Sequence, residues 1–251
     1  MGKEKEKGLS SLPSILIGIL VKNTKLNLDN LASQVIGFDY PKELLSIVFL
    51  EGDSEDGSYE HLKDIMPLFS DWKAACLEKL DFGFKLSHEL HHVEEKPQGL
   101  RQRQRLINLA KLRQYVVDKY LKDESFLWWV DSDYKVIPKD TLAKLLSYDK
   151  DMVIPLLKLE GKEEAYDRST DRKDMDIDNL VRTYPNQLVG VDYMSAHARI
   201  KSKVFRAGAN YLSDFSAPVI DQEGAVLTRK AKALGFKPYL ATGCVIYHIP
   251  D

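Results

Sequence analysis

The stretch SFLWWVDSD, residues 125–133, is an apolar run that ends in acidic residues. Its five consecutive apolar residues, FLWWV, indicate a strand that is buried on both faces, as strands of parallel sheets are. The run ends abruptly in two aspartates, Asp131 and Asp133. In open parallel sheets, ligands bind outside the carboxyl ends of the strands. The stretch therefore predicts both the type of sheet and the edge at which a functional site lies.

Further apolar runs of strand length alternate with longer segments of helical period. The sequence predicts strands at 14–21, 44–53, 81–90, 125–133, 151–157 and 237–249, and helices at 27–36, 59–80 (with a break near Pro67), 99–121, 139–149, 201–208 and 220–234. Successive parallel strands need crossover connections, which are usually helices. We therefore expect a single α/β domain with a mainly parallel central sheet flanked by helices. The stretch 158–186, poor in apolar residues, is predicted to be a long loop and a candidate lid.

Composition indicates an ordinary soluble domain of 251 residues, with 44% apolar and 29% charged residues. The formal net charge of −2 gives no general attraction to nucleic acid or to an anionic membrane. Cys76 and Cys244 are far apart in the sequence and are expected to be free thiols in a reducing compartment. The apolar run 15–21 is far shorter than the ~20 residues that span a bilayer. We expect residues 1–11 to be a mobile tail and the chain to be cytoplasmic, or membrane-associated through a partner or a further segment.

Asp131 and Asp133 are candidates for binding a divalent cation. Alternate residues of a strand share one face, so both carboxylates are expected on the same side. Two adjacent carboxylates repel each other unless a cation or a donor lies between them. Mg²⁺ and Mn²⁺ prefer oxygen ligands and commonly join carboxylates to substrate phosphates. The alternative is a pair of solvated turn aspartates.

Two other segments could contact a nucleotide. The second predicted strand ends in the acidic loop EGDSEDGS, residues 51–58, whose carboxylates could accept hydrogen bonds from ribose hydroxyls or a base. The alternative is a loop that only caps the next helix. Arg101, Arg103 and Arg105 lie at the start of the helix 99–121, where the helix dipole and the guanidinium groups could meet a diphosphate. The alternative is a solvated basic face.

Taken together, these motifs resemble the GT-A family of nucleotide-sugar-dependent glycosyltransferases, over almost the whole chain from Ser14 to His248. The sequences of these motifs are similar to those of the fungal mannan-polymerase α-mannosyltransferases. The segments that match are FDYPKELLSIVFLEGDSEDGSYE (38–60), WWVDSDYKVIP (128–138) and IDQEGAVLTRKAKALGF (220–236). The resemblance implies a GT-A (Rossmann-like) catalytic domain over 12–251, with a nucleotide-binding half at about 12–133 and an acceptor-binding half at about 134–251.

The resemblance also implies roles for individual residues. These are, for a Mn²⁺ or Mg²⁺ ion, Asp131, Asp133 and His248; for the donor, Glu51, Asp53, Arg105, Arg113 and Asp131; and for catalysis, the late acidic pair Asp221 and Glu223, with Asp221 ahead. Two departures from the family pattern concern Glu-Gly-Asp at 51–53, where Asp-Asp-Gly is commoner, and Gln114, which stands in place of an asparagine.

The activity that the resemblance implies is metal-dependent transfer of a sugar, mannose from GDP-mannose, to a glycan, a lipid-linked sugar or a small molecule. One alternative is an inverting, family-2-like glycosyltransferase that uses a UDP- or dTDP-sugar. Two more remote alternatives are a non-catalytic nucleotide- or glycan-binding domain and a zinc metallopeptidase. The peptidase would use His88, Glu89 and His92, which fit H-E-x-x-H. Its motif follows strand-like alternation rather than a helical pattern. The position of the third histidine holds Gln98, and no glutamate occurs between Glu95 and Glu124.

Overall fold

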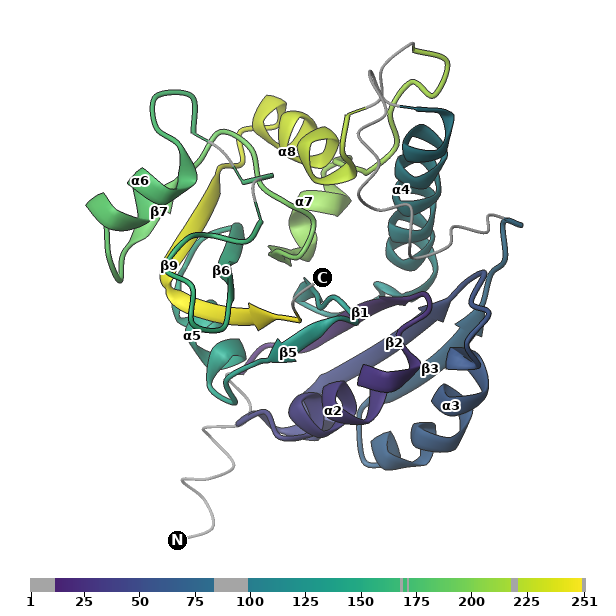
Figure 1. The fold of residues 1–251 in the computed structure, drawn as a ribbon. Helices are drawn as coiled ribbons and strands as arrows, with labels where there is room; N and C mark the ends of the chain where they lie inside the picture. Colours follow the sequence, from purple (N-terminus) through teal and green to yellow (C-terminus); the bar gives the residue numbers. More distant parts are fainter. Residues whose placement is uncertain (1–11, 84–98, 168, 171, 218–220, 250–251) are drawn as a thin grey trace, which may run out of the picture.

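The computed structural model describes residues 12–83, 99–167, 169–170, 172–217 and 221–249. The predicted tail and the H-E-x-x-H motif lie outside these residues. The described strands are β1 Ile15–Val21, β2 Leu45–Glu51, β3 Ala74–Lys79, β4 Phe126–Trp129, β5 Tyr134–Val136, β6 Met152–Leu159, β7 Leu188–Gly190, β8 Arg199–Lys201 and β9 Pro238–His248. The α-helices are α2 Lys25–Ile36, α3 Ser58–Ile65, α4 Leu100–Tyr120, α5 Thr141–Ser147, α6 Ile177–Thr183, α7 Ser202–Arg206 and α8 Glu223–Ala233. The predicted single α/β domain is confirmed (Figure 1).

The first half of the sheet is parallel, in the order β3-β2-β1-β4. Alternate residues of β1 enter different cores. Ile15, Ile17 and Ile19 pack on the face that α2 and α3 cover, whereas Leu16 packs on the opposite face with residues of α4. Figure 1 shows α2 and α3 on one side of these strands and α4 on the other. Because helices cover both faces, successive positions of the strand are apolar.

The third strand is Ala74–Lys79, so the prediction of a helix through residue 80 is wrong. Most of the strand predicted at 81–90 falls outside the described residues. The helix ends at Ile65 and is followed by the 3-10 turn Met66–Phe69, so the break near Pro67 is confirmed. Among the described residues, β3 pairs with β2 alone, and none of its positions is fully buried. Because β3 is partly exposed, its sequence mixes apolar and polar residues, and this mixture was misread as the continuation of an amphipathic helix. Residues 81–83 form an irregular connection, and 84–90 lie outside the described residues.

The second half of the sheet is mixed and curls back on itself. From β4 the order continues β8-β6-β9-β5, with β8 antiparallel to both its neighbours and β9 parallel to β6. Pro155 and Leu156 of β6 pair with Ala241 and Val245, so β9 carries a large bulge between them. Gly243 lies in this bulge, where an added Cβ would be 2.9 Å from the Asn186 Cα. Such a bulge bends a strand, and Figure 1 shows β9 curving toward β5.

The curl has a direct consequence for the site. Beyond the bulge, β9 pairs with β5, and His248 lies opposite Tyr134. Because β5 follows β4 after one short turn, the last residue of the last strand reaches the carboxyl end of β4. The parallel ladders of β1, β2, β3, β4, β6 and β9 are longer than the antiparallel ones, so the sheet is mainly parallel, as predicted.

The predicted loop 158–186 is partly structured. It begins within β6 and contains α6, at whose start the Asp176 carboxylate accepts a hydrogen bond from the Asn179 amide at 3.0 Å.

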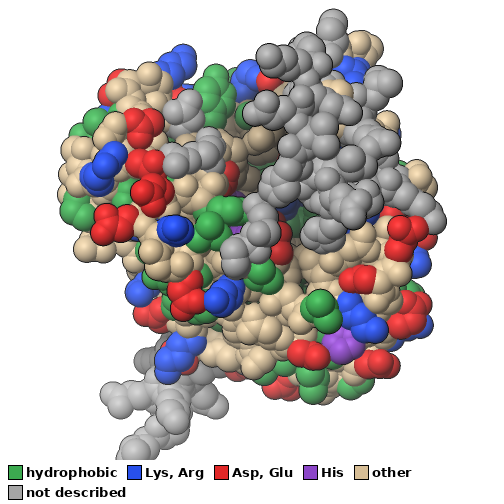
Figure 2. Space-filling view, viewed as in Figure 1, with side chains coloured by type: hydrophobic (Ala, Val, Ile, Leu, Met, Phe, Trp, Pro, Cys, Tyr) green, Lys and Arg blue, Asp and Glu red, His purple; other side chains and the backbone are tan. Residues whose placement is uncertain are grey.

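On the face seen in Figure 2, acidic and basic side chains of the described residues are interspersed. Cys76 and Cys244 are both free, as predicted. Within the described ranges, no helix is long and apolar enough to cross a membrane.

Candidate active site

The two aspartates of the D-x-D motif lie in a turn that joins β4 to β5. β4 ends at Trp129, so the period of a strand does not apply to Asp131 and Asp133, and our reasoning that both would leave one face of a strand is wrong. The Asn27 side chain of α2 donates to the carbonyl oxygens of Ser132 (2.8 Å) and Tyr134 (3.0 Å). These bonds hold the turn from the α2 side of the sheet and fix the direction of the two acids.

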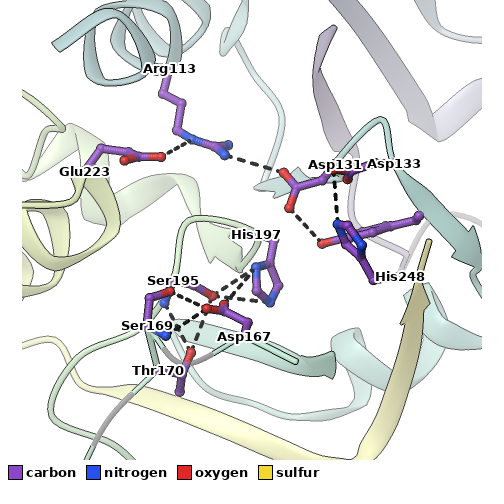
Figure 3. A network of polar contacts seen from close by, with 11 residues as sticks. Arg113, Asp131, Asp133, Asp167, Ser169, Thr170, Ser195, His197, Glu223 and His248 are labelled. Carbon is purple, nitrogen blue, oxygen red and sulfur yellow. Dashed lines mark hydrogen bonds and ion pairs between the residues drawn. The ribbon is translucent and has the colours of Figure 1, made fainter. Parts of the chain in front are cut away.

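Arg113 links two of the predicted carboxylates. It lies on α4 with 5% of its surface exposed. Its Nε donates to Glu223 Oε1 at 3.2 Å, and its Nη2 is 3.5 Å from Asp131 Oδ1 (Figure 3). The guanidinium also lies over the ring of Trp129, 4.5 Å from the ring centroid. Burial disfavours the charged form, but the Glu223 and Asp131 carboxylates outweigh it and raise the pKa of Arg113.

Asp133 turns away from Arg113 and meets His248. Its Oδ2 lies 3.1 Å from His248 Nε2, while His248 Nδ1 donates to the Ile249 carbonyl at 2.5 Å. Burial alone would raise the pKa of Asp133 and lower that of His248, but their mutual hydrogen bond and charge reverse both shifts. The structure therefore brings together the second acid of the motif and the closing histidine, which are far apart in the sequence.

Asp133 and His248 fit a divalent cation. Asp133 Oδ1 is buried and accepts no hydrogen bond from the described residues, and a carboxylate oxygen is the ligand that Mg²⁺ and Mn²⁺ prefer. The Nδ1–H bond to Ile249 is the outer contact that metal-bound histidines usually make, and it leaves Nε2 toward the metal. Within the described part of the chain, no three or more His, Cys, Asp or Glu side chains lie close enough together to hold a metal ion. Asp131 is turned to Arg113 and to the Tyr134 hydroxyl, 3.2 Å from its Oδ2.

The two late acids have different surroundings. Glu223, at the start of α8, is buried and bonds to Arg113. Asp221 is exposed and precedes α8, and its carboxylate pairs with Arg229 of that helix at 2.7 Å. We ranked Asp221 ahead, but the described contacts join Glu223, not Asp221, to the other acids of the site. Gly224 makes this placement possible, because an added Cβ would lie 2.6 Å from the Met194 carbonyl oxygen.

At the end of β2, Glu51 and Asp53 are both engaged in the loop. Glu51 is fully buried and accepts from the Ser54 amide at 2.9 Å, while its Oε2 has no hydrogen-bond partner among the described residues. Asp53 has a positive φ of 57° and accepts from the amides of Phe82 (3.1 Å) and Gly83 (2.8 Å). Asp53 therefore holds the connection after β3, whereas Glu51 Oε2 has, within the described ranges, only a long ion pair, 3.9 Å from Lys79 Nζ.

The arginines at the start of α4 also differ from one another. Arg103 donates to the carbonyl oxygens of Phe215 and Ala217 and so holds the segment before α8. Burial acts to raise the pKa of Asp133, whereas the larger effect of His248 and the smaller effect of the positive charge of Arg105 lower it. Of the two, Arg105 is thus the one whose charge reaches the D-x-D turn.

A second polar group, absent from the sequence predictions, lies next to these residues (Figure 3). We call it the Asp167 group; its members are Asp167, Ser169, Thr170, Ser195 and His197. We call the predicted residues described above the carboxylate–arginine group; its members are Arg113, Asp131, Asp133, Glu223 and His248. Burial, followed by the charges of Asp131, Asp133 and Asp167, raises the pKa of Tyr134 well above its usual value, so Tyr134 lies within the field of both groups. No motif marks the second group, since its members come from two separate irregular segments.

This architecture is that of the GT-A glycosyltransferases, as the sequence resemblance implied. The family model described as Anp1 matches residues 2–194. The chain therefore belongs to the Anp1 family.

Individual relatives are more distant. A glycosyltransferase 25 family member of Aedes aegypti is 28% identical over 153 residues, covering 59% of this chain and 24% of the relative. The mannan polymerase II complex anp1 subunit of Schizosaccharomyces pombe is 24% identical over 167 residues, covering 61% of this chain and 38% of the relative. The chain thus spans about a quarter to two fifths of the length of these curated relatives.

Solved structures match over nearly the whole chain. The mannosyltransferase PcManGT from Pyrobaculum calidifontis, in complex with GDP-Man and Mn²⁺, has a TM-score of 0.60 at 12% identity, covering 95% of this chain and 58% of that one. TarS 1-349 of S. aureus, in complex with UDP-GlcNAc, has a TM-score of 0.58 at 13% identity, covering 95% and 59%. At such identities these matches establish the fold alone.

Proposed function

We propose that this chain is a metal-dependent glycosyltransferase that moves a hexose from a nucleotide-sugar to a hydroxyl acceptor, with mannose from GDP-mannose as the favoured donor. The observation that carries the proposal is the meeting of Arg113, Asp131 and Glu223 beside Asp133 and His248 at the carboxyl end of β4. Family membership and the GT-A architecture support it.

The cation would be held by Asp133 and His248, with Asp131 as a further ligand after it turns from Arg113. When bound, it would neutralise charge that develops on the departing nucleoside diphosphate. Arg105 would contact the same phosphates from the start of α4. Glu51, whose Oε2 accepts no hydrogen bond among the described residues and has only the ion pair with Lys79, is the better placed of the two β2 acids to accept a hydrogen bond from the nucleoside.

Glu223 would act through Arg113 rather than on the substrate. Its hydrogen bond fixes the guanidinium between two carboxylates in a site that the Trp129 ring also covers. A fixed cationic group of this kind stabilises a developing negative charge without having to reorganise. We therefore assign Glu223 as a positioning residue.

The test is a thermal-shift panel of GDP-, UDP-, CMP- and dTDP-sugars, with and without Mn²⁺. We expect the largest stabilisation with GDP-mannose and Mn²⁺ together, since a ligand that binds only the folded state raises its stability. The Asp133→Ala variant should lose the Mn²⁺-dependent part of the shift. Absence of stabilisation of the wild-type protein by every donor would refute the proposal.

The second candidate is an inverting enzyme that uses a UDP- or dTDP-sugar. It is favoured by the TarS match, which was solved with UDP-GlcNAc. The same panel separates the candidates by nucleotide, and the anomeric configuration of the product, read by NMR, separates retention from inversion.

A further inference from the structure

The Asp167 carboxylate is half satisfied. Its Oδ1 accepts from the Ser169 amide at 2.8 Å and from the Ser169 hydroxyl at 2.6 Å. Its Oδ2 is buried and accepts no hydrogen bond of ordinary geometry within the described ranges. It lies 3.5 Å from His197 Nδ1, and the Ser195 hydroxyl makes a weaker contact with the carboxylate that helps to lower its pKa. The side chain as a whole is 20% exposed. A buried acid that serves only to hold a loop would normally have both oxygens bonded.

The support beneath Asp167 is buried and polar. His197 is 4% exposed, Ser195 6% and Thr170 3%. The Ser195 hydroxyl lies 2.9 Å from His197 Nδ1, and the Ser195 amide donates to Thr170 Oγ1 at 3.2 Å. Thus the chain before β8 and the segment that carries Asp167 are joined by hydroxyl groups, and the imidazole stands directly behind the carboxylate.

Aromatic rings join this group to the carboxylate–arginine group. The Tyr134 ring meets His197 edge-on at 6.4 Å between centroids, and its hydroxyl reaches Asp131. Tyr166, next to Asp167, stacks on His248 at 4.2 Å. Two separate contacts therefore fix Asp167 relative to the D-x-D turn and to the closing histidine. Figure 3 shows the Asp167 group below Arg113 and Glu223 and beside His248.

From this geometry we propose that Asp167 Oδ2 binds a sugar hydroxyl next to the D-x-D turn, and that His197 is the positioning residue behind it. The inference rests on the proposed function and names a contact with the sugar rather than with the metal or the nucleotide. A carboxylate oxygen accepts a strong, charge-assisted hydrogen bond from an O–H donor. The hydroxyl belongs either to the acceptor or to the donor sugar, which the experiment below distinguishes.

The test compares Asp167→Asn with Asp174→Asn, an exposed acid of the same segment that bonds to Arg172. The amide of Asp167→Asn keeps an oxygen for Ser169 but replaces the open oxygen by a donor. We expect unchanged affinity for the nucleoside diphosphate with Mn²⁺ in both variants. In Asp167→Asn alone, one of two constants should weaken by about tenfold or more, the effect of one lost hydrogen bond. A rise in KM for the acceptor assigns the hydroxyl to the acceptor; weaker binding of the intact nucleotide-sugar assigns it to the donor.

A second measurement compares substrates that lack single hydroxyls, first with the wild-type protein, where one of them should bind as weakly as the intact substrate binds to Asp167→Asn. With Asp167→Asn, that same substrate should show little further loss. His197→Gln should show the same defect in weaker form. Wild-type constants in Asp167→Asn, or an equal loss of nucleoside diphosphate binding, would overturn the inference while leaving the proposed function intact. If the wild-type protein binds no nucleoside diphosphate, the proposed function fails and the inference fails with it.

Discussion

The carboxylate–arginine group and the Asp167 group lie on either side of Tyr134, yet they are built differently. In the first, Arg113 and His248 stand between three acids, so opposite charges satisfy one another across α4, α8 and the ends of β4 and β9. In the second, one acid is held by hydroxyls, an amide and an imidazole from irregular segments. Removing one side chain should therefore have unequal effects on stability. The loss should be large in the carboxylate–arginine group, where a buried charge is left unpaired, and small in the Asp167 group, where mostly neutral groups remain.

The largest expected effect is on stability, in Arg113→Met. Removing a buried arginine from between Glu223 and Asp131 leaves unpaired acids, and breaking such a buried pair lowers the free energy of unfolding by about 3–5 kcal/mol. Urea denaturation measures the loss, with Arg229→Met, an exposed ion-pair partner of Asp221, as the control. Adding Glu223→Gln to Arg113→Met should recover part of the loss; strictly additive losses would contradict the coupling between the two side chains.

Next comes the loss of activity in Asp133→Asn. The change removes a charged oxygen that faces His248, and we expect transfer to fall by roughly 10²–10³-fold, the scale for a group that stabilises developing charge. Isothermal titration calorimetry should show that Asp133→Asn binds Mn²⁺ more weakly than the wild-type protein does. The matched control is Asp149→Asn, an exposed acid paired with Lys201. Equal Mn²⁺ affinity in the wild type and Asp133→Asn would exclude this residue as a ligand.

The two late acids provide a smaller and sharper comparison. Glu223→Gln keeps a hydrogen-bond acceptor for Arg113 but removes the charge, so we expect kcat to fall by about 10–100-fold, as for outer residues that position a reactive group. Asp221→Asn should change kcat less than about twofold, because its side chain is solvent-exposed and pairs with Arg229. Steady-state kinetics of both variants decides; the opposite ranking would restore Asp221 as the acid of the site.

The smallest effect is the pH dependence of stability that Asp167 contributes. Burial acts to raise the pKa of Asp167, but the charge of His197 and the Ser169 hydroxyl lower it overall. A lowered folded-state pKa gives stability that is present above the unfolded pKa of about 3.9 and is lost as the pH falls through the folded value. Without metal at pH 7, we expect the free energy of unfolding of the wild-type protein to be about 1 kcal/mol larger than that of Asp167→Asn. Urea denaturation across pH should show this difference disappear in acid; a difference that grows in acid would contradict the sign.

Much of the fold could be predicted from local pattern. The largely apolar runs that became β1, β2, β4 and β6 are buried at most positions on both faces, so apolar residues follow one another with few interruptions. β3 was missed because it is a partly exposed strand whose residues mix polarity. The strand-end rule located Asp131 and Asp133, but it could not show that β4 ends at Trp129 or that the two acids face different partners.

The sequence alone determined the class of fold and the D-x-D edge, because buried strands and acids at their ends leave a local signal. The other members of the carboxylate–arginine group, Arg113, Glu223 and His248, were predicted through the resemblance to the GT-A family. Only the tertiary structure decided that Glu223 rather than Asp221 meets Arg113, and that the bulge in β9 carries His248 to Asp133. It also assembled the Asp167 group, whose members have no spacing in common. These contacts depend on how a bent strand, a helix start and two irregular segments pack together, and packing between distant segments leaves no period in the chain.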